Sequence, residues 1–256
     1  MSDLKGYSTP GTPGIGVHKK NEGETGISSD LQTLVQSGVG MLLWLVKHKR
    51  PDVSNPVREL SKATSEATGF AWKELRRVIR YVLDTRNLGL KMEVKSTKDD
   101  WDLLVYTDSD YAGDKETRKS VTGYVIYLRG VPICWKSKAQ RSVTLSSTEA
   151  EFVALSEAAK EIKFIVQVMW SLNMSVELPV VVRVDNVGAI YLANNLNTSQ
   201  RTKHIDVRYN YVREFVEDDF IKIYFVRTDE NDADIFTKNT TTDIFQRHSE
   251  KLVGEK

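Results

Sequence analysis

Residues 103–139, LLVYTDSDYAGDKETRKSVTGYVIYLRGVPICWKSKA, contain the pattern that decides the fold. Three apolar segments in this stretch are rich in β-branched and aromatic residues and are bounded by turn-forming residues, which is typical of short strands. They cover residues 103–107, 121–128 and 131–135, and Arg129-Gly130 forms the turn between the last two. We therefore predict an antiparallel meander of three strands.

Helical and strand patterns alternate after the meander. Residues 149–170 place apolar side chains at helical spacing, whereas residues 178–185, LPVVVRVD, form the near-continuous apolar run of a strand that is buried on both faces. Further helices are predicted near residues 187–193 and 204–216, a fifth strand at 220–226, a helix from about residue 233 and a last amphipathic segment at 244–253. This order, βββαβααβα, predicts an α/β fold with a mixed five-stranded sheet, strands 1-3 antiparallel, flanked by helices.

Upstream of the predicted sheet the sequence divides into two parts. Residues 1–29 are rich in Gly, Ser, Thr and Pro and have few apolar residues, so we expect a flexible leader. Residues 30–98 contain helical patterns, and we expect a small all-helical module there. In the first of these patterns the apolar positions are Leu31, Leu34, Val35, Val39, Leu42, Leu43 and Val46. The expected sheet domain covers residues 101–253.

Composition excludes several classes of protein. The chain has 256 residues, of which 40% are apolar, enough for a packed core. Cys134 is its single cysteine, which excludes an intramolecular disulfide and a thiolate metal site and suits a reducing compartment. The longest apolar stretch, residues 39–46, is too short to cross a bilayer, and the N-terminus has no apolar secretion signal. We therefore expect a soluble intracellular protein, cytoplasmic or nuclear, with no membrane partner.

The net charge of +1 hides an uneven distribution of charge. Residues 1–100 hold 16 Lys and Arg against 12 Asp and Glu, and residues 101–256 hold 20 against 23. A near-neutral chain argues against a nucleic-acid partner, because phosphate binding usually shows as a basic excess. The acidic excess in the second part is either solvated surface or a set of carboxylates that holds divalent cations.

Acidic residues follow the predicted strands, where ligands usually gather in α/β sheets. Asp108 follows the first strand, Asp185 ends the fourth, Asp234 comes just after the fifth, and Glu151 or Glu149 lies in the first turn of the long helix. Four converging carboxylates require a cation, and an all-oxygen ligand set favours Mg²⁺ or Mn²⁺. A pair of such ions can stabilise both the attacking and the leaving oxygen in phosphodiester hydrolysis.

Each of these acids also has a purely structural interpretation. An Asp after a strand is most often a turn or helix-capping residue. The spacing of Thr148 and Glu151 fits a capping box, in which Glu151 merely closes the start of the helix. Composition and spacing alone therefore leave a nuclease as one hypothesis among several.

Five motifs in the second part resemble the ribonuclease H domain of copia-type retrotransposon polyproteins. They are YTDSDYAGDKETRKSVTGYV, SSTEAEFVALSEAAKE, VDNVGAIYLANN, RTKHIDVRYNYVRE and DADIFTKN. The resemblance covers residues 101–253, and the helical segments upstream look like the reverse-transcriptase thumb and connection region of the same polyproteins. It implies a ribonuclease H-like fold preceded by a small all-helical module.

The resemblance also implies an active site. It assigns the family's catalytic, metal-binding acids to Asp108, Glu151, Asp185 and Asp234, with Glu149 as the fallback for Glu151. By analogy, Asp108 and Asp185 bind metal most directly, Glu151 also helps to place the RNA 2′-hydroxyl, and Asp234 holds a second metal. Two Mg²⁺ ions are expected, with Mn²⁺ as a substitute. The implied reaction is hydrolysis of the RNA strand of an RNA/DNA hybrid.

Contacts with this substrate are expected from three groups of residues. Two polar residues beside the acids can bind the backbone near the scissile bond or make ordinary turn hydrogen bonds. A basic segment, similar to the family's Thr-Lys-His-Ile-Asp element, can contact phosphates or form a solvated helix start, and arginines of the helical module can touch hybrid phosphates. The three groups are Ser109 and Asn186; Arg201, Lys203, His204 and Arg208; and Arg76, Arg77 and Arg80.

The sequence departs from the family at two places. The loop RTDEND, residues 227–232, has no histidine, which many cellular ribonucleases H carry there, and Asn210 stands where relatives often show His. No paired-aspartate motif of a polymerase palm precedes the helical segments, so we expect no DNA synthesis, and the rest of a reverse transcriptase is a candidate partner in trans. The alternative hypothesis is a non-catalytic retroelement remnant that binds nucleic acid or a partner chain. An integrase-type nuclease is disfavoured because Glu151 precedes Asp185.

Overall fold

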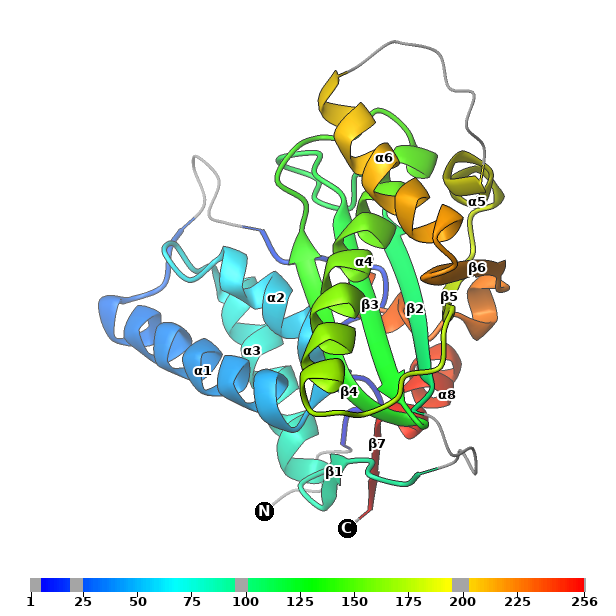
Figure 1. Cartoon of the computed structure of the whole chain (residues 1–256). Coiled ribbons are helices and arrows are strands. Elements are labelled where there is room, and N and C mark those ends of the chain that lie inside the picture. The colour runs from blue at the N-terminus through cyan, green and yellow to red at the C-terminus, as the bar shows by residue number, and fades with distance from the viewer. Residues whose placement is uncertain (1–5, 19–24, 95–100, 195–202, 256) are drawn as a thin grey trace. The chain divides into compact units, whose positions relative to one another are not determined.

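The computed structural model describes residues 6–18, 25–94, 101–194 and 203–255, and for residues 203–207 the backbone alone. The chain forms two compact units. Met92–Thr237 is one unit, and Met1–Lys91 together with Lys238–Lys256 is the other. Figure 1 shows the elements of both units coloured along the chain. Each unit has its own secondary structure and core.

The Met92–Thr237 unit is built on a mixed sheet with the strand order β4-β3-β2-β5-β6 (Figure 1). β2, β3 and β4 pair antiparallel, whereas β5 is parallel to β2 and β6 is parallel to β5. The bounds are β2 (Leu103–Asp110), β3 (Val121–Leu128), β4 (Val131–Ala139), β5 (Val180–Val184) and β6 (Ile221–Phe225). The prediction of a mixed five-stranded sheet with an antiparallel meander is therefore confirmed.

The register of the sheet brings the ends of β2 and β5 to the same edge. Thr107 of β2 lies opposite Val184, the last residue of β5. The residues that follow them, Asp108 and Asp185, are therefore neighbours. On the other side of β2, Asp108 lies opposite Gly123 of β3. A Cβ atom at Gly123 would lie 2.6 Å from Cγ2 of Thr237, so the missing side chain lets the segment around Thr237 approach β3 closely.

Helices lie on both faces of this sheet. The long helix α4 contacts β2 and β3 on one face, with α5 and α6 against it. The short helix α7 packs at Gly123, which points to the face opposite Tyr124 and α4. The core under α4 is apolar and fully buried, and it includes Val105, Leu155 and Ile162. The bounds are α4 (Ser147–Ser171), α5 (Val187–Asn194), α6 (Lys203–Glu217), η2 (Thr228–Glu230) and α7 (Asp234–Thr237).

The second unit is helical apart from one short pair of strands. Its helices are α1 (Ser29–His48), η1 (Pro51–Val53), α2 (Ser54–Lys62), α3 (Gly69–Asp84) and α8 (Thr242–Leu252), and β1 (Leu88–Leu90) pairs antiparallel with β7 (Val253–Glu255). Arg50 and Asp52 form a buried ion pair at 2.7 Å, and the Tyr81 hydroxyl donates to the same carboxylate. This network joins the residues after α1 to α3.

Residues 6–18, part of the expected flexible leader, make specific hydrogen bonds in this unit. The hydroxyl of Thr12 donates to the carboxylate of Glu74 over 2.7 Å. The backbone N–H of Val17 donates to the carboxylate of Glu59 over 2.9 Å. Composition alone predicts a leader without fixed partners, but these two buried glutamates supply the acceptors that hold it.

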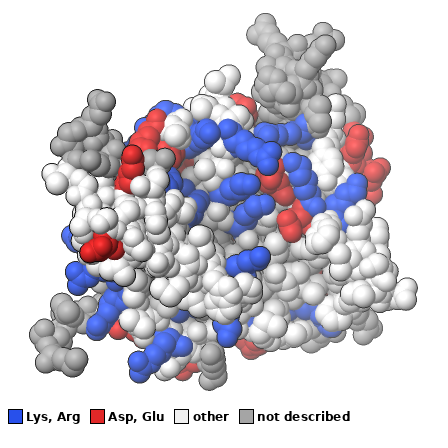
Figure 2. Space-filling view, turned by 90° about the vertical axis from the view of Figure 1, so that its left-hand side faces the viewer, with Lys and Arg blue, Asp and Glu red and all other residues white. Residues whose placement is uncertain are grey.

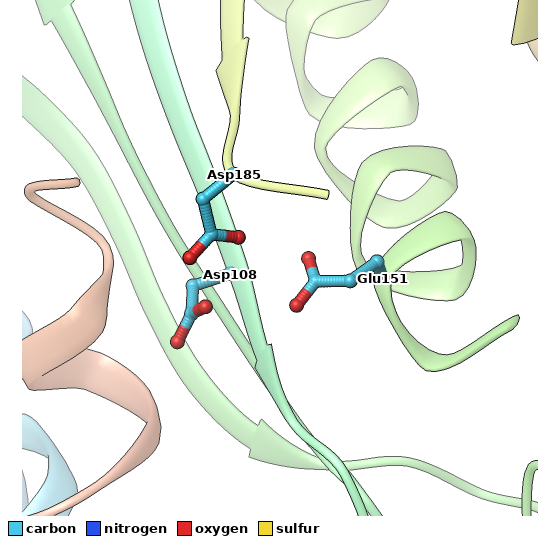
Figure 3. Close-up of side chains that lie close together, drawn as sticks. All are labelled: Asp108, Glu151 and Asp185. Carbon is cyan, nitrogen blue, oxygen red and sulfur yellow. The ribbon is translucent and has the colours of Figure 1, made fainter. Parts of the chain in front are cut away.

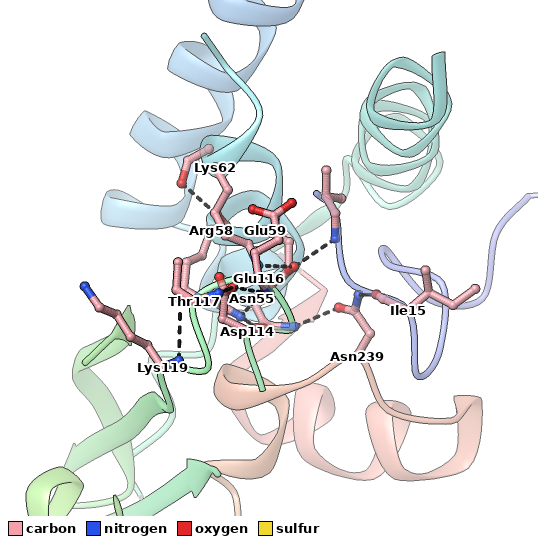
Figure 4. A network of polar contacts seen from close by, with 12 residues as sticks. Ile15, Asn55, Arg58, Glu59, Lys62, Asp114, Glu116, Thr117, Lys119 and Asn239 are labelled. Carbon is pink, nitrogen blue, oxygen red and sulfur yellow. Dashed lines mark hydrogen bonds and ion pairs between the residues drawn. The ribbon is translucent and has the colours of Figure 1, made fainter. Parts of the chain in front are cut away.

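The C-terminal segment also belongs to the helical unit. The side-chain amide of Asn239 donates to the carbonyl of Ile15 and accepts a hydrogen bond from Asn55, as Figure 4 shows. The sequence places residues 101–253 in one sheet domain, whereas in the structure residues 238–256 group with the helices. These bonds and the β1–β7 pairing are the physical reason for that grouping.

The buried face of α1 agrees only in part with the predicted one. Leu34 and Leu43, two of the expected core positions, are 54% and 45% exposed. Val35, Val39 and Leu42 are buried as predicted, and Gly38, which is not among the predicted positions, is buried with them because a Cβ atom there would lie 3.1 Å from Leu75 of α3. The glycine allows a close helix contact that a purely apolar pattern does not reveal. None of the helices in the described ranges is long and apolar enough to cross a bilayer.

Candidate metal centre

Three carboxylates meet at the edge where β2 and β5 end. Asp108 comes from β2, Asp185 directly follows β5, and Glu151 comes from the start of α4 (Figure 3). Each offers one oxygen, and these oxygens all lie within 4.8 Å of one another. Asp108 and Glu151 are buried and Asp185 is half-buried. The arrangement can hold a metal ion through oxygen ligands only, which suits Mg²⁺ or Mn²⁺.

Glu151 is not needed for the hydrogen bonds at the start of α4, so its side chain can face Asp108 and Asp185. The hydroxyl of Ser146, the N-cap residue, accepts a hydrogen bond from the backbone N–H of Glu149. The carboxylate of Glu149 in turn accepts the backbone N–H of Leu145 over 2.7 Å. The helix is therefore closed by Ser146 and Glu149, and the predicted capping box of Thr148 with Glu151 is wrong.

The buried carboxylate of Glu151 has few hydrogen bonds to offset the loss of hydration. One carboxylate oxygen accepts the backbone N–H of Ser109 over 3.1 Å, while the other is buried and has no hydrogen-bond partner in the described part of the chain. Burial, together with the charges of Asp108 and Asp185, raises the pKa of Glu151 to about 9, and the backbone hydrogen bond from Ser109 opposes the shift. A cation among the three groups would satisfy this oxygen and favour the ionised form.

Asp108 is held by a residue that the sequence did not single out. The hydroxyl of Thr237, in α7, donates to the Asp108 carboxylate and lies 2.9 Å from the carbonyl of Asp234. Thr237 is part of the motif DADIFTKN, yet nothing in its spacing distinguishes it from an ordinary helix residue. Only the close approach of α7 to β3 reveals the contact.

Asp234 begins α7 and is buried, 2% exposed. Within the described residues it lies outside the group of three carboxylates, so its role as a fourth metal ligand stays a prediction. The loop before it is anchored to the sheet, because Asn231 donates to the carbonyl of Thr107 and the Tyr127 hydroxyl donates to Asp232. The loop therefore has a fixed position beside Asp108.

The two polar residues beside the acids have different surroundings. The side-chain oxygen of Asn186 accepts the backbone N–H of Ala189 over 2.9 Å, which is the local bond of a helix start. The hydroxyl of Ser109 is buried and has no hydrogen-bond partner among the described residues. A contact of either residue with a nucleic-acid backbone stays a prediction.

The basic residues predicted to bind the substrate have different surroundings in the structure. Arg201 lies outside the described residues, and so do the side chains of Lys203 and His204. Arg208 is half-buried on α6. In the helical unit Arg76 is exposed. Two further arginines there have partners of their own: Arg77 donates to Thr9 and lies over the Tyr7 ring, and Arg80 pairs with Asp84.

Comparisons with known proteins find retroelement relatives. The chain is 36% identical to the retrovirus-related Pol polyprotein from transposon RE2 of Arabidopsis thaliana and 37% identical to that from transposon TNT 1-94 of Nicotiana tabacum. These matches cover 84% and 85% of the chain but 14% and 16% of the polyproteins, so the chain spans about one seventh of their length.

A solved structure resembles part of the chain more distantly, and no protein-family profile matches. The structure is that of LC11-RNase H1 in complex with an RNA/DNA hybrid. It is 15% identical, with a TM-score of 0.41, over 53% of this chain and 93% of that one.

Proposed function

This chain belongs to the Pol polyproteins of copia-type retrotransposons, and from that premise we propose that it is a ribonuclease H that cuts the RNA strand of RNA/DNA hybrids with a divalent metal. Its Met92–Thr237 unit has the ribonuclease H-like fold that the sequence predicts, with a mixed five-stranded sheet and flanking helices. The observation that carries the proposal is the convergence of Asp108, Glu151 and Asp185 at one edge of that sheet.

The residues present fit a hard divalent cation. Three carboxylates with oxygens within 4.8 Å repel one another, and one buried oxygen of Glu151 lacks a hydrogen-bond partner in the described chain. Asp108, Glu151 and Asp185 would hold Mg²⁺, with Mn²⁺ as a substitute, and Asp234 is the candidate ligand for a second ion. Bound Mg²⁺ would activate water and neutralise charge on the phosphate.

The protein's own groups prepare this site in three ways. The Ser109 N–H and the Thr237 hydroxyl orient the carboxylates of Glu151 and Asp108. The buried position of both acids limits competing hydration. The hydroxyl of Ser109 is buried beside the cluster without a hydrogen-bond partner among the described residues, and a 2′-hydroxyl near Glu151 would distinguish RNA from DNA.

The proposal assigns different roles to the sheet unit and to the helices. We assign hybrid cleavage to the sheet unit and substrate grip to the helices of residues 30–98, where Arg76 is exposed. The chain spans about one seventh of the polyproteins it matches, and the remainder of a reverse transcriptase is the proposed partner in trans.

The test is cleavage of a hybrid whose RNA strand carries a 5′ label, at millimolar Mg²⁺. Wild-type protein should cut the RNA strand, and Asp108→Asn and Glu151→Gln should each lower the rate at least 100-fold. Glu149→Gln is the matched control on the same helix, and it should keep most activity because Glu149 only closes the helix start.

Two outcomes would overturn the assignment. Loss of activity in Glu149→Gln with retention in Glu151→Gln would show that the wrong glutamate has been placed in the site. Hybrid binding without any cleavage by folded wild-type protein, in Mg²⁺ and in Mn²⁺, would favour the non-catalytic alternative.

A further inference from the structure

The sheet has an open face over β5 and β6, opposite the face that α4 covers. In β5, Val182 is buried in the core and Arg183 is half-buried. In β6, Ile223 is buried in the same core, whereas Tyr224 is 39% exposed. Because side chains alternate between the two faces of a strand, the exposed ones share the second face. The sequence predicts that residues 178–185 form a strand buried on both faces, and for this face the prediction is wrong.

The helices of the sheet unit lie elsewhere. Those that pack on β5 and β6 within the described chain are α4, α5 and α6, on the opposite face. α7 lies on the open side but packs against β2, β3 and β4. Figure 2 shows the left-hand side of Figure 1, where Lys and Arg gather around fewer acidic side chains, whereas β6 lies at the right-hand edge of the sheet in Figure 1. The open face is therefore separate from that basic surface.

A row of large side chains crosses the open face. Tyr106 of β2 lies opposite Arg183 of β5, and Arg183 lies opposite Tyr224 of β6. Lys222 precedes Tyr224 by two residues, so both side chains point to the same face. Tyr106 and Arg183 are half-buried, and Lys222 and Tyr224 are exposed. We call these four residues the open row.

The Tyr224 ring lies close to two cations. The Cζ atom of Arg183 lies 5.1 Å from the centre of the ring, and the Nζ atom of Lys222 lies 5.7 Å from it. The ion pairs between described residues do not include either cation. The half-buried Arg183 holds the ring by a cation–π contact, while the exposed Lys222 has a flexible side chain that can turn to another partner.

Acidic side chains lie at the other end of the open row. Burial raises the pKa of Tyr106, the charges of Asp232 and Glu230 raise it as well, and the charge of Arg183 lowers it. The Tyr127 hydroxyl donates to the carboxylate of Asp232 over 3.1 Å. The positive charge of the open row is therefore concentrated at β6, where it favours an anionic ligand.

The open row is close to the three carboxylates. Asp108 follows Tyr106 by two residues in β2, and Asp185 follows Arg183 by two residues just after β5. Two residues of a strand span about 7 Å, so the row lies about 7 Å from the carboxylate edge along the strands. A ligand that leaves the carboxylate edge can continue directly onto the open row.

The size and chemistry of the open row fit a single nucleic-acid strand. A typical protein interface uses about 20–30 residues a side, whereas the open row offers an exposed ring and two cations. Proteins bind single strands of any sequence by stacking bases on aromatic rings and by placing cations along the backbone. A double helix would not present its bases to Tyr224, because they are stacked inside it.

We propose that the open row binds single-stranded RNA that extends from a hybrid whose paired part lies at the carboxylates. One base stacks on Tyr224, and Lys222 turns from the ring to a phosphate. Arg183 keeps the ring in position. The inference rests on the proposed function, since it takes the RNA strand to be the one at the metal centre. The enzyme then prefers hybrids that end in an unpaired stretch of RNA.

The experiment compares two fluorescent RNA/DNA hybrids by anisotropy, one blunt and one with an RNA extension of about six nucleotides at either end. A Glu151→Gln background prevents cleavage. The extension should tighten binding about five- to tenfold, and Tyr224→Ala should remove this gain without changing affinity for the blunt hybrid. Lys222→Gln should reduce the gain and lower the slope of log Kd against log salt by about 1 for the extended hybrid alone.

Two variants serve as controls. Tyr224→Phe keeps the ring and should keep the gain. Phe225→Ala removes the next aromatic side chain of β6, which is 51% exposed but belongs to the other face, and it should keep the gain as well. An extension of the same length on the DNA strand should add no affinity that depends on Tyr224. If only the DNA extension shows that dependence, the assignment to the RNA strand is wrong.

The outcomes separate this inference from the proposed function. Cleavage of the blunt hybrid by the wild type, combined with a gain that is absent or that survives Tyr224→Ala, would overturn the open row alone. A gain that depends on Tyr224, without cleavage of any hybrid, would support the open row and overturn the proposed catalysis. If Tyr224→Ala converts a dimer into a monomer in sedimentation and leaves RNA binding unchanged, the open row is a contact between copies of the chain, and the inference is overturned.

Discussion

Replacing Glu151 by glutamine should stabilise the metal-free protein at neutral pH while it removes activity. In the folded, metal-free chain burial and two neighbouring carboxylates raise the pKa of Glu151 to about 9, whereas an unfolded chain ionises Glu near its ordinary value of 4.5. Between pH 4.5 and about pH 9, Glu151 is protonated in the folded state and ionised in the unfolded state. Stability is therefore lost as the pH rises from about 4.5 towards 9.

The size of this effect follows from the pH interval. At pH 7 the interval above the ordinary pKa is about 2.5 units, and each unit corresponds to about 1.4 kcal/mol, so the cost is at most about 3.5 kcal/mol. Glutamine keeps the shape of the side chain and cannot ionise. The free energy of unfolding of metal-free Glu151→Gln should therefore be up to about 3.5 kcal/mol higher than that of the wild type at pH 7, and almost the same at pH 4.5.

The assay is urea denaturation in EDTA at a series of pH values, with Glu149→Gln as the control on the same helix. Adding Mg²⁺ should stabilise the wild type more than Glu151→Gln, because the ion needs the carboxylate. The reasoning is refuted if Glu151→Gln is less stable than the wild type in EDTA at pH 7, or if the difference between the two proteins does not change with pH.

Three further predictions concern single contacts. Thr237→Val should weaken Mg²⁺ binding about tenfold in a metal titration of activity, because the Thr237 hydroxyl orients the metal-binding carboxylate of Asp108. Thr237→Ser keeps the hydroxyl and should bind Mg²⁺ like the wild type, and equal loss in both variants would contradict this role. Gly123→Ala should lower the free energy of unfolding by about 1–3 kcal/mol, since the new methyl group meets α7, while Gly40→Ala, which has nothing within 4 Å, should not destabilise; urea denaturation of both variants decides. Asp52→Asn should cost about 3–5 kcal/mol in the same assay because it leaves Arg50 buried without its ion pair, and a loss below about 1 kcal/mol would argue against a buried pair.

The sheet could be predicted from the sequence because its signals are local. The alternating and apolar runs at residues 103–107, 121–128 and 178–185 have the period and length of strands, and each lies within an observed strand or contains one. β1 and β7 could not be predicted, because each has three residues and its partner lies at the other end of the chain. The contacts of residues 6–18 were hidden for the same reason: their acceptors, Glu59 and Glu74, are distant in sequence.

The candidate site shows the same limit. Asp108, Glu151 and Asp185 could be named because acids after strands and at a helix start converge in such a sheet, and the structure brings these three together. The choice of Glu151 over Glu149 came from a motif, whereas the structure supplies the physical reason, which is that Glu149 is used at the helix start. Thr237 is a neutral hydroxyl with no pattern, so only the folded packing of α7 reveals its contact.

The grouping of residues 238–256 with residues 1–91 makes the sheet unit an insertion within the helical one. While the sheet is folded, it holds Trp101 and Thr237, from which the chain leads back towards the helical unit, at a fixed separation. Once it unfolds, the helical unit must close a flexible loop of about 150 residues, at an entropic cost of about 4 kcal/mol. A substitution that destabilises only the sheet will therefore weaken the helical unit as well, without touching any of its residues.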